Sequence, residues 1–233
     1  MRRGFVQSKT DPCLYIRNNN GVKMYLLVYV DDYLLGSSIE EEIHRICESL
    51  SEEFEITCLG GVRHFLGMEF QQEYGVYQIS LSNYIDNLIE KYGVRDAKTA
   101  RSPMDIGYPK QKEQGKLFED ATKYRSLIGG QLYISVNARP DIAACTAILG
   151  RKVSAPSESD WTAAKRVLRY LKGTKHYELQ LGGNQDQQLA GYSDADWAGD
   201  IDTSVWIRTF VRWRSYFVDK SSTSQCHPIE YGS

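Results

Sequence analysis

The sequence predicts an α+β protein, in which an antiparallel sheet with helices is followed by a mainly helical region. Two apolar runs, residues 24–30 and 33–35, flank a pair of acids, which indicates a β-hairpin. Apolar residues then recur at helical spacing at residues 39–54 and 82–92, and again in three segments between residues 121 and 173. A chain of 233 residues has room for one large domain or two small ones.

The charge of the chain is small in total and uneven along its length. The formal net charge of −2 does not by itself indicate a nucleic-acid partner. Residues 38–55, however, carry seven acids against one base, and residues 151–176 carry seven bases against two acids. A local basic surface is therefore compatible with the nearly neutral total.

Cysteine usage and hydropathy indicate an intracellular protein without a membrane partner. The five cysteines are scattered and form no C-x-x-C pair, which argues against a disulfide framework or a zinc site and suits a reducing compartment. No apolar run approaches the roughly 18 residues needed to span a membrane. No signal peptide opens the sequence.

The central hairpin follows a strand at residues 13–17 and a turn at residues 18–21. Its first strand is apolar on both faces, so we expect it to be buried on both sides. Adjacent carboxylates at Asp31 and Asp32 would then be costly, because mutual repulsion and desolvation both oppose their ionisation. A divalent cation removes this cost, and Mg²⁺ is usually held by one or two carboxylates plus phosphates. The alternative is a solvated turn that Asp-Asp simply favours.

The spacing of apolar residues and the positions of glycine and proline predict the elements after the hairpin. One apolar face of the helix at residues 39–54 should pack on the sheet. Residues 64–70 and 75–81 predict a second hairpin, and a helix follows that Gly93 ends. Residues 95–120 are polar and contain prolines and glycines, so we interpret them as a linker.

The helical region is expected to contain three helices. The first covers about residues 121–136, with an inward face made of Tyr124, Leu127, Ile128, Leu132 and Val136. The second begins after Pro140, and the third runs from Ser157 to Gly173. The outer face of the third carries four bases, which form either a solvated face or a contact with a phosphate backbone: Lys165, Arg166, Arg169 and Lys172. Strands at residues 177–181 and 188–194 should follow.

Seven stretches resemble, in the correct order, the copia-type retrotransposon polyprotein, a reverse transcriptase followed by an RNase H domain. The likeness covers about residues 4–200, and the order of the stretches makes it specific. They are GFVQSKTDPCLYI (4–16), LLVYVDDYLLGSS (26–38), HFLGMEF (64–70), ISLSNYI (79–85), YRSLIGGQLYISVNARPDI (124–142), WTAAKRVLRYLKGT (161–174) and YSDADWAGD (192–200).

The resemblance implies a domain order. The expected parts are a partial reverse-transcriptase palm at residues 1–94, the linker, a helical thumb and connection at residues 121–176, and the first strands of an RNase H-like domain at residues 177–204.

It also implies site residues. In the Tyr-x-Asp-Asp motif, Tyr29 would contact nucleic acid, Asp31 would be a catalytic metal ligand and Asp32 its weaker neighbour. Residues 65–68, with Phe65, Leu66 and Gly67, resemble the primer grip that contacts nucleic acid. The first RNase H carboxylate would be Asp194, with Asp196 as an alternative.

The implied chemistry is RNA-directed DNA polymerisation, a nucleotidyl transfer that uses two Mg²⁺ (or Mn²⁺) ions. The implied partners are an RNA template, a DNA primer and the remainder of the polyprotein, in a cytoplasmic virus-like particle or the nucleus. In the family, a third carboxylate and the fingers precede the stretch that begins at Gly4. We therefore expect this chain to be inactive alone. The alternatives are a non-catalytic nucleic-acid-binding remnant that uses the basic helix at residues 157–175, and an inert remnant.

The tail at residues 205–233 departs from the resemblance. Four short segments can be written in codons that encode motifs of the family when the reading frame is shifted by one base. Residues 206–208 then give Gly-Tyr, residues 212–214 Gly-Gly, residues 216–219 Ile-Ser-Trp and residues 229–233 Ser-Ser-Thr-Glu-Ala. We therefore hypothesise a frameshift near residues 203–206, which the coding DNA would test. Residues from about 205 onward should then pack poorly.

Overall fold

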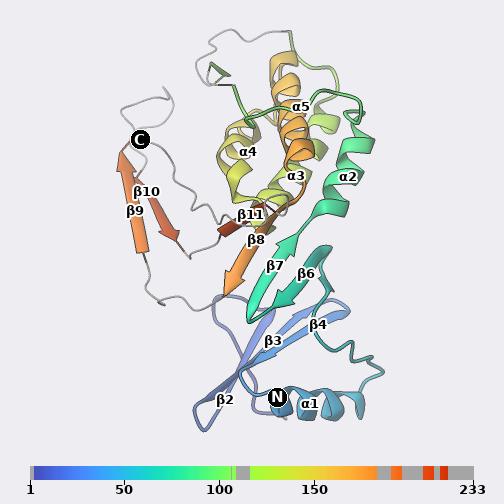
Figure 1. Cartoon of the computed structure of the whole chain (residues 1–233), viewed down its shortest axis with the longest axis vertical. Coiled ribbons are helices and arrows are strands. Elements are labelled where there is room, and N and C mark those ends of the chain that lie inside the picture. The colour runs from blue at the N-terminus through green and yellow to red at the C-terminus, as the bar shows by residue number, and fades with distance from the viewer. Residues whose placement is uncertain are drawn as a thin grey trace. The chain divides into compact units, whose positions relative to one another are not determined.

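A computed structural model describes residues 3–105, 107–108 and 116–182, and the backbone of three further strands at residues 190–195, 207–212 and 216–219. The chain divides into two compact units, residues 1–66 and 67–233. Both combine antiparallel sheet with helix, so the predicted α+β class is confirmed (Figure 1).

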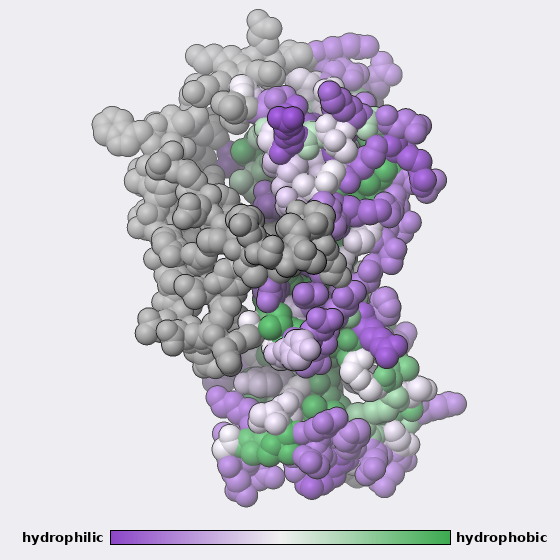
Figure 2. Space-filling view, viewed as in Figure 1, coloured by the Kyte–Doolittle hydropathy of each residue, from purple (hydrophilic) through white to green (hydrophobic). Residues whose placement is uncertain are grey.

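The first unit is a four-stranded antiparallel sheet with one helix. Its strands lie in chain order, and the helix α1 packs on one face of the sheet through a small core of Phe5, Met24, Leu26 and Ile46. The elements are β1 (Val6–Gln7), β2 (Leu14–Asn19), β3 (Val22–Tyr29), β4 (Asp32–Ser37) and α1 (Glu40–Ser51). Hydrophilic side chains gather over α1, at the bottom of Figure 2, where the sequence is acidic.

The expected burial of the central hairpin on both faces is wrong. Met24 and Leu26 of β3 are 1% and 8% exposed, whereas the alternating residues Tyr25 and Tyr29 are 42% and 51% exposed. Successive side chains of a strand point to opposite faces, and α1 covers one face only. The prediction counted these tyrosines as apolar residues of the second face. Tyrosine tolerates exposure because its hydroxyl group can remain in solvent.

The second unit contains a sheet in the order β11-β8-β7-β6 and a bundle of helices. Strands β7 and β8 pair from Val76 with Gly182 to Ile79 with Leu179, so the second hairpin meets a strand about 100 residues later. The strands are β6 (Met68–Glu73), β7 (Val76–Ser80), β8 (Tyr177–Gly182) and β11 (Tyr216–Asp219), and a separate antiparallel pair is formed by β9 (Ala190–Ala195) and β10 (Ile207–Arg212).

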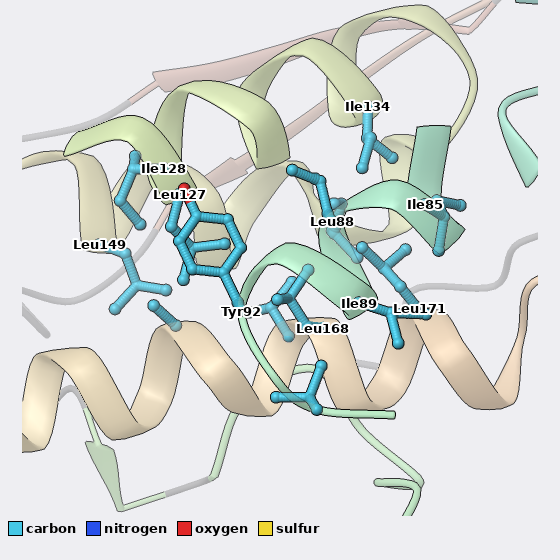
Figure 3. Packing of buried hydrophobic residues seen from close by; sticks show 14 of the residues in the cluster. Ile85, Leu88, Ile89, Tyr92, Leu127, Ile128, Ile134, Leu149, Leu168 and Leu171 are labelled. Atoms are coloured by element: carbon cyan, nitrogen blue, oxygen red, sulfur yellow. The ribbon is translucent and has the colours of Figure 1, made fainter. Parts of the chain in front are cut away.

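The helices of the second unit surround one apolar core. Leu88, Leu127, Leu149 and Leu168 each come from a different helix and are buried together (Figure 3). A Cβ atom on Gly130 would lie 3.0 Å from Leu88 Cδ1, so glycine allows close packing there. The helices are α2 (Ser82–Lys91), α3 (Ala121–Asn137), the 3₁₀ turn η2 (Pro140–Ile142), α4 (Ala143–Gly150) and α5 (Glu158–Gly173).

The predicted inward face of α3 is wrong in its second half. Leu132 and Val136 are 52% and 74% exposed, and the fully buried positions there are Gln131 and Ile134. Gln131 is buried because its Nε2 donates a hydrogen bond of 2.8 Å to the carbonyl oxygen of Ala164 in α5. Its Oε1 is buried without a hydrogen-bond partner among the described residues. A buried polar residue held by one specific hydrogen bond gives no signal in hydrophobic periodicity.

The remaining domain predictions stay predictions. The unit boundary lies between Leu66 and Gly67, so the primer-grip-like hairpin of β6 and β7 belongs to the second unit. Most of the tail lies outside the described residues, and β10 and β11 are known there as backbone strands. Within the described part of the chain, no helix is both long and apolar enough to cross a membrane.

Candidate functional site

The two acids of the first unit lie at the tip of the β3–β4 hairpin, as expected. The register pairs Tyr29 with Asp32, so the two-residue turn consists of Val30 and Asp31. The turn therefore begins one residue earlier than Asp31, and Asp32 is the first residue of β4. Asp31 and Asp32 are both exposed.

The backbone at this turn is strained. Val30 has a φ of +53° and is 79% exposed. Two-residue hairpin turns usually place Gly, Asn or Asp at positive φ, whereas a β-branched residue is an outlier there. A strained residue of this kind costs about 1–3 kcal/mol, and such residues cluster at functional sites. The strain marks this turn as a candidate site.

Asp32 lies on the face of the sheet away from α1. Residues directly opposite in an antiparallel pair share a face, so Asp32 shares the face of Tyr29, while Leu26 and Leu35 share the face that packs on α1. Tyr29 is half-exposed beside Asp32. The face with Asp32 is thus open in this unit to a ligand that approaches the turn.

The chemistry of the turn fits part of a Mg²⁺ site. Carboxylate oxygens are the ligands that Mg²⁺ takes from proteins, usually one or two together with waters and substrate phosphates. Because Asp31 and Asp32 are exposed, their ionisation carries no large desolvation cost that a cation would have to offset. The fit to Mg²⁺ therefore rests on the type of ligand and its position at the turn. Among the described residues, no three His, Cys, Asp or Glu side chains gather as a metal site.

The segment that resembles a primer grip contains a second tight turn. Strand β5 (His64–Phe65) is followed by Leu66 and Gly67 at φ of +51° and +79°, so the predicted strand at residues 64–70 is broken there. Phe65 is buried and Gly67 is exposed. A Cβ atom on Gly67 would lie 3.1 Å from the Tyr133 hydroxyl oxygen of α3, so this tight approach and the φ of +79° both favour glycine here.

Asp194, the predicted RNase H carboxylate, lies in β9. Its backbone is opposite Arg208 of β10. Asp196 lies outside the described residues.

The basic row of α5 is largely engaged within the protein. Arg169 donates from Nε to the carbonyl oxygen of Lys98 at 2.5 Å, and Lys172 donates to the carbonyl oxygens of Arg95 and Ala97. These bonds attach the segment predicted as a linker to α5. Cationic donors on carbonyl oxygens form charge-assisted hydrogen bonds, which are stronger than neutral ones.

The two remaining bases of the row differ from each other. Arg166 donates to the backbone and side chain of Ser102 at 3.3 and 3.2 Å and pairs with Asp105 at 3.0 Å. Lys165 Nζ lies 5.4 Å from the centre of the Trp161 ring, a cation–π contact that leaves the ammonium group able to bind an anion. Of the four predicted nucleic-acid contacts, Lys165 is thus the least engaged.

Sequence reasoning missed two lysines that lie with Lys165 around the same aromatic residues. Lys123 of α3 lies 5.7 Å from the Trp161 ring, and Lys91 of α2 lies 5.4 Å from the ring of Tyr92, which meets Trp161 edge-on. Within the described part of the chain, no ion pair joins an acid to Lys91, Lys123 or Lys165. These three lysines, here called the lysine patch, come from three helices, so no local spacing could have grouped Lys91 and Lys123 with Lys165.

Arg139 was also missed, and it is the most buried cation described. It is 1% exposed, donates to both carboxylate oxygens of Asp141 at 2.9 and 2.7 Å, and donates to the carbonyl oxygen of Thr174 at 2.8 Å. Burial, with the Asp141 carboxylate adding, raises the pKa of Tyr170, which donates to Asp141 at 2.8 Å. This network fixes the end of α5 against η2.

Comparisons with known proteins agree with these motifs. A family profile described as "Reverse transcriptase (RNA-dependent DNA polymerase)" matches residues 1–106. The chain is 30% identical over 230 residues to the "Retrovirus-related Pol polyprotein from transposon RE1" of Arabidopsis thaliana and 34% identical over 233 residues to that from transposon TNT 1-94 of Nicotiana tabacum.

The extent of these matches differs between relatives. The chain spans only 15% of the Arabidopsis polyprotein and 17% of the tobacco polyprotein, while the matches cover 99% and 91% of this chain. It is also 31% identical over 180 residues to an uncharacterized mitochondrial protein of Arabidopsis thaliana, a match that covers 77% of this chain and 74% of that protein. No solved structure matches the chain.

Proposed function

The chain belongs to the reverse transcriptase family of copia-type retrotransposon Pol polyproteins, and from that premise we propose that it carries the metal-binding turn of an RNA-directed DNA polymerase. The observation that carries the proposal is the strained two-residue turn that presents Asp31 and Asp32 to solvent at the tip of the β3–β4 hairpin. The ligand would be Mg²⁺ or Mn²⁺, and the partners would be an RNA template and a DNA primer.

Each residue of the turn has a defined part in this proposal. Asp31, within the turn, would be the main ligand, and Asp32, one residue further on the open face, would be the second. Bound there, the cation would supply the charge that activates the primer 3′-oxygen and stabilises the pyrophosphate. Tyr29, beside Asp32 on the same face, offers an aromatic edge and a hydroxyl group to the primer end.

The two acids provide only part of a polymerase site. Two carboxylates leave most of a six-oxygen Mg²⁺ shell to waters, phosphates and further protein ligands. We propose that the remainder of the polyprotein supplies the further carboxylate, and that this chain alone does not extend a primer. The turn at Leu66 and Gly67 would position the primer, and Asp194 would serve RNase H.

A second candidate function, nucleic-acid binding without catalysis, is favoured by the lysine patch. Arg166, Arg169 and Lys172 are engaged with residues 95–105, so their contribution to a phosphate contact would require those bonds to break. Lys123 and Lys165 have no such bond to break in the described part of the chain, whereas Lys91 would give up a hydrogen bond of 3.2 Å from its Nζ to Ser126 Oγ; all three lie around Trp161 and Tyr92. Both functions would be exercised where the polyprotein assembles, in a cytoplasmic particle or the nucleus.

Primer extension on an RNA template tests the proposed function. Within the polyprotein, Asp31→Asn should abolish extension with Mg²⁺ and with Mn²⁺, while the matched variant Asp96→Asn, at an exposed acid of the second unit, should retain it. Retained extension in Asp31→Asn would overturn the assignment. Extension by this chain alone, lost in Asp31→Asn, would overturn the need for a further carboxylate.

A further inference from the structure

Ser102 lies in an exposed bend between α2 and α3, and an arginine of α5 contacts it twice. Arg166 donates from Nε to the carbonyl oxygen of Ser102 at 3.3 Å and from Nη2 to its hydroxyl oxygen at 3.2 Å. The hydroxyl group in turn donates to the carbonyl oxygen of Met104 at 3.1 Å. The Ser102 hydroxyl group is therefore accessible from solvent and also lies beside a guanidinium group.

The segment around Ser102 lies along α5 and is attached on both sides of the serine. Residues 98–105 form neither helix nor strand. Before the serine, the amide of Ala100 donates to the carbonyl oxygen of Arg169 at 3.2 Å. After it, Asp105 forms an ion pair of 3.0 Å with Arg166. A chemical change at Ser102 would therefore act directly on the attachment of this segment to α5.

The residue that follows Ser102 is a proline. Ser102-Pro103 is the only Ser-Pro or Thr-Pro pair in the sequence. Proline has no N–H group, so an enzyme that binds the chain here needs no acceptor at that position, and the residue before a proline favours extended backbone. A serine followed directly by proline is the pattern on which proline-directed protein kinases act.

Arg166 is positioned to hold a phosphate group on this hydroxyl oxygen. A phosphoserine carries a charge of about −1.5 to −2 and three acceptor oxygens, and arginine binds phosphate through two N–H groups at once. The side chain of Arg166 is 26% exposed, whereas that of its ion-pair partner Asp105 is 67% exposed. The Asp105 carboxylate can turn into solvent at little cost, because an ion pair with so exposed a partner contributes little. A phosphate would therefore replace Asp105 as the main partner of Arg166.

We propose that Ser102 is a phosphorylation site and that Arg166 holds the phosphate. The enzyme is a proline-directed serine/threonine kinase, and ATP is the phosphoryl donor. The Ser102 hydroxyl oxygen attacks the γ-phosphorus of ATP, an O–P bond forms, the bond from that phosphorus to the bridging oxygen breaks, ADP leaves and the hydroxyl proton is released. The phosphate then attaches residues 98–105 more firmly to α5.

Ser126 of α3 is the internal control for this site. It is also exposed, and a cation contacts its hydroxyl oxygen, because Lys91 Nζ donates to it at 3.2 Å. It lies within a helix, however, and the next residue is Leu127. An exposed serine beside a cation is thus present with and without the following proline, and only Ser102 should accept phosphate.

Incubation of the full chain with ATP, Mg²⁺ and a purified mitogen-activated protein kinase tests the site. Mass spectrometry should find one phosphoryl group, on Ser102, and Ser102→Ala should abolish it. Pro103→Ala keeps the acceptor hydroxyl group but should lower the initial rate about tenfold, because the added N–H group would lose water without gaining an acceptor. No phosphate on Ser102, phosphate on Ser126, or an unchanged rate in Pro103→Ala would overturn the proposal.

The holding role of Arg166 has its own test, by NMR of the phosphorylated chain. A neighbouring cation favours the dianion, so the pKa of the phosphoserine should lie below its usual value of about 6 and return to it in Arg166→Gln. Phosphorylation should also slow hydrogen exchange of the Ala100 amide in the wild type and leave it unchanged in Arg166→Gln. Arg125→Gln, at an exposed arginine of α3, should behave as the wild type. Equal pKa values in the wild type and Arg166→Gln would overturn the role of Arg166.

Discussion

Arg169 of α5 donates a hydrogen bond of 2.5 Å from its side chain to the backbone carbonyl oxygen of Lys98. The amide of Ala100 donates in turn to the carbonyl oxygen of Arg169 at 3.2 Å, so the two segments are joined in both directions. A residue predicted to contact nucleic acid thus stabilises a segment predicted to be a linker. The charged side chains of Arg169 and its neighbours in this row therefore stabilise the fold of the second unit.

Loss of this hydrogen bond should expose the segment. We expect Arg169→Gln to lower the free energy of unfolding by about 1 kcal/mol, the usual net value of a hydrogen bond at a partly exposed site. Limited trypsin digestion should then cut faster after Lys98 and Arg101. Lys152→Gln, at an exposed position, is the matched control. Equal cutting rates in the two variants would show that Arg169 does not hold the segment.

Relief of strain at the turn of Val30 and Asp31 should stabilise the first unit. Val30 has a φ of +53°, which glycine adopts without strain because it has no Cβ atom. The Val30 side chain is exposed, so Val30→Gly removes few packing contacts. We expect a gain of about 1 kcal/mol by urea denaturation, because glycine's entropy cost offsets part of the strain. Asn20→Gly, where asparagine already tolerates a φ of +48°, should change little. A loss of stability in Val30→Gly would contradict the assignment of strain.

The buried Arg139 should depend strongly on its partner. Asp141→Asn leaves a guanidinium that is 1% exposed without its counter-charge, and breaking a buried pair costs about 3–5 kcal/mol. Asp86→Asn removes the acid of an ion pair with Lys175 whose side chains are 48% and 43% exposed, and should cost less than about 1 kcal/mol. Chemical denaturation of both variants measures the difference, and equal losses would contradict the structural role of Arg139.

Stability should fall at alkaline pH through Cys145. Burial raises the pKa of this thiol from 9.0 to about 11, so its stabilising effect is complete below the lower value and is lost as pH rises through the higher one. Burial also raises the pKa of Tyr124 and of Tyr170. Urea midpoints measured across this window should fall less steeply in Cys145→Ala than in the wild type. Parallel curves would contradict the contribution of Cys145.

The lysine patch should carry any affinity for nucleic acid. Replacement of Lys123 and Lys165 by Gln should weaken binding to an RNA–DNA duplex and reduce the salt slope by about 0.9 for each phosphate that is no longer neutralised. The matched variant Lys116→Gln removes an exposed lysine that pairs with Glu119 at 3.4 Å, and it should bind as the wild type. Fluorescence anisotropy at several salt concentrations measures both, and equal slopes would exclude the patch.

Sequence patterns located the central hairpin because apolar runs and a polar interruption are local signals. They placed the two acids at or beside the turn, and Asp31 lies in the turn with Asp32 next to it. They did not indicate that Val30 shares the turn, because a β-branched residue rarely adopts positive φ. Periodicity failed on α3 where Gln131 is buried through a hydrogen bond to a distant helix. The partners of Arg166 and Arg169 lie more than 60 residues away in the sequence, so no local pattern could show that the basic row is engaged.

Titration of the chain with Mn²⁺, followed by NMR, tests the proposed metal-binding turn most directly. Paramagnetic broadening should begin at the amides of residues 29–33 and should disappear in Asp31→Asn, while the signals of α1, which carries three acids in its first turn, should broaden only at higher concentration. Broadening that begins at α1, or that is the same in the wild type and Asp31→Asn, would contradict a metal site at the Tyr-Val-Asp-Asp turn.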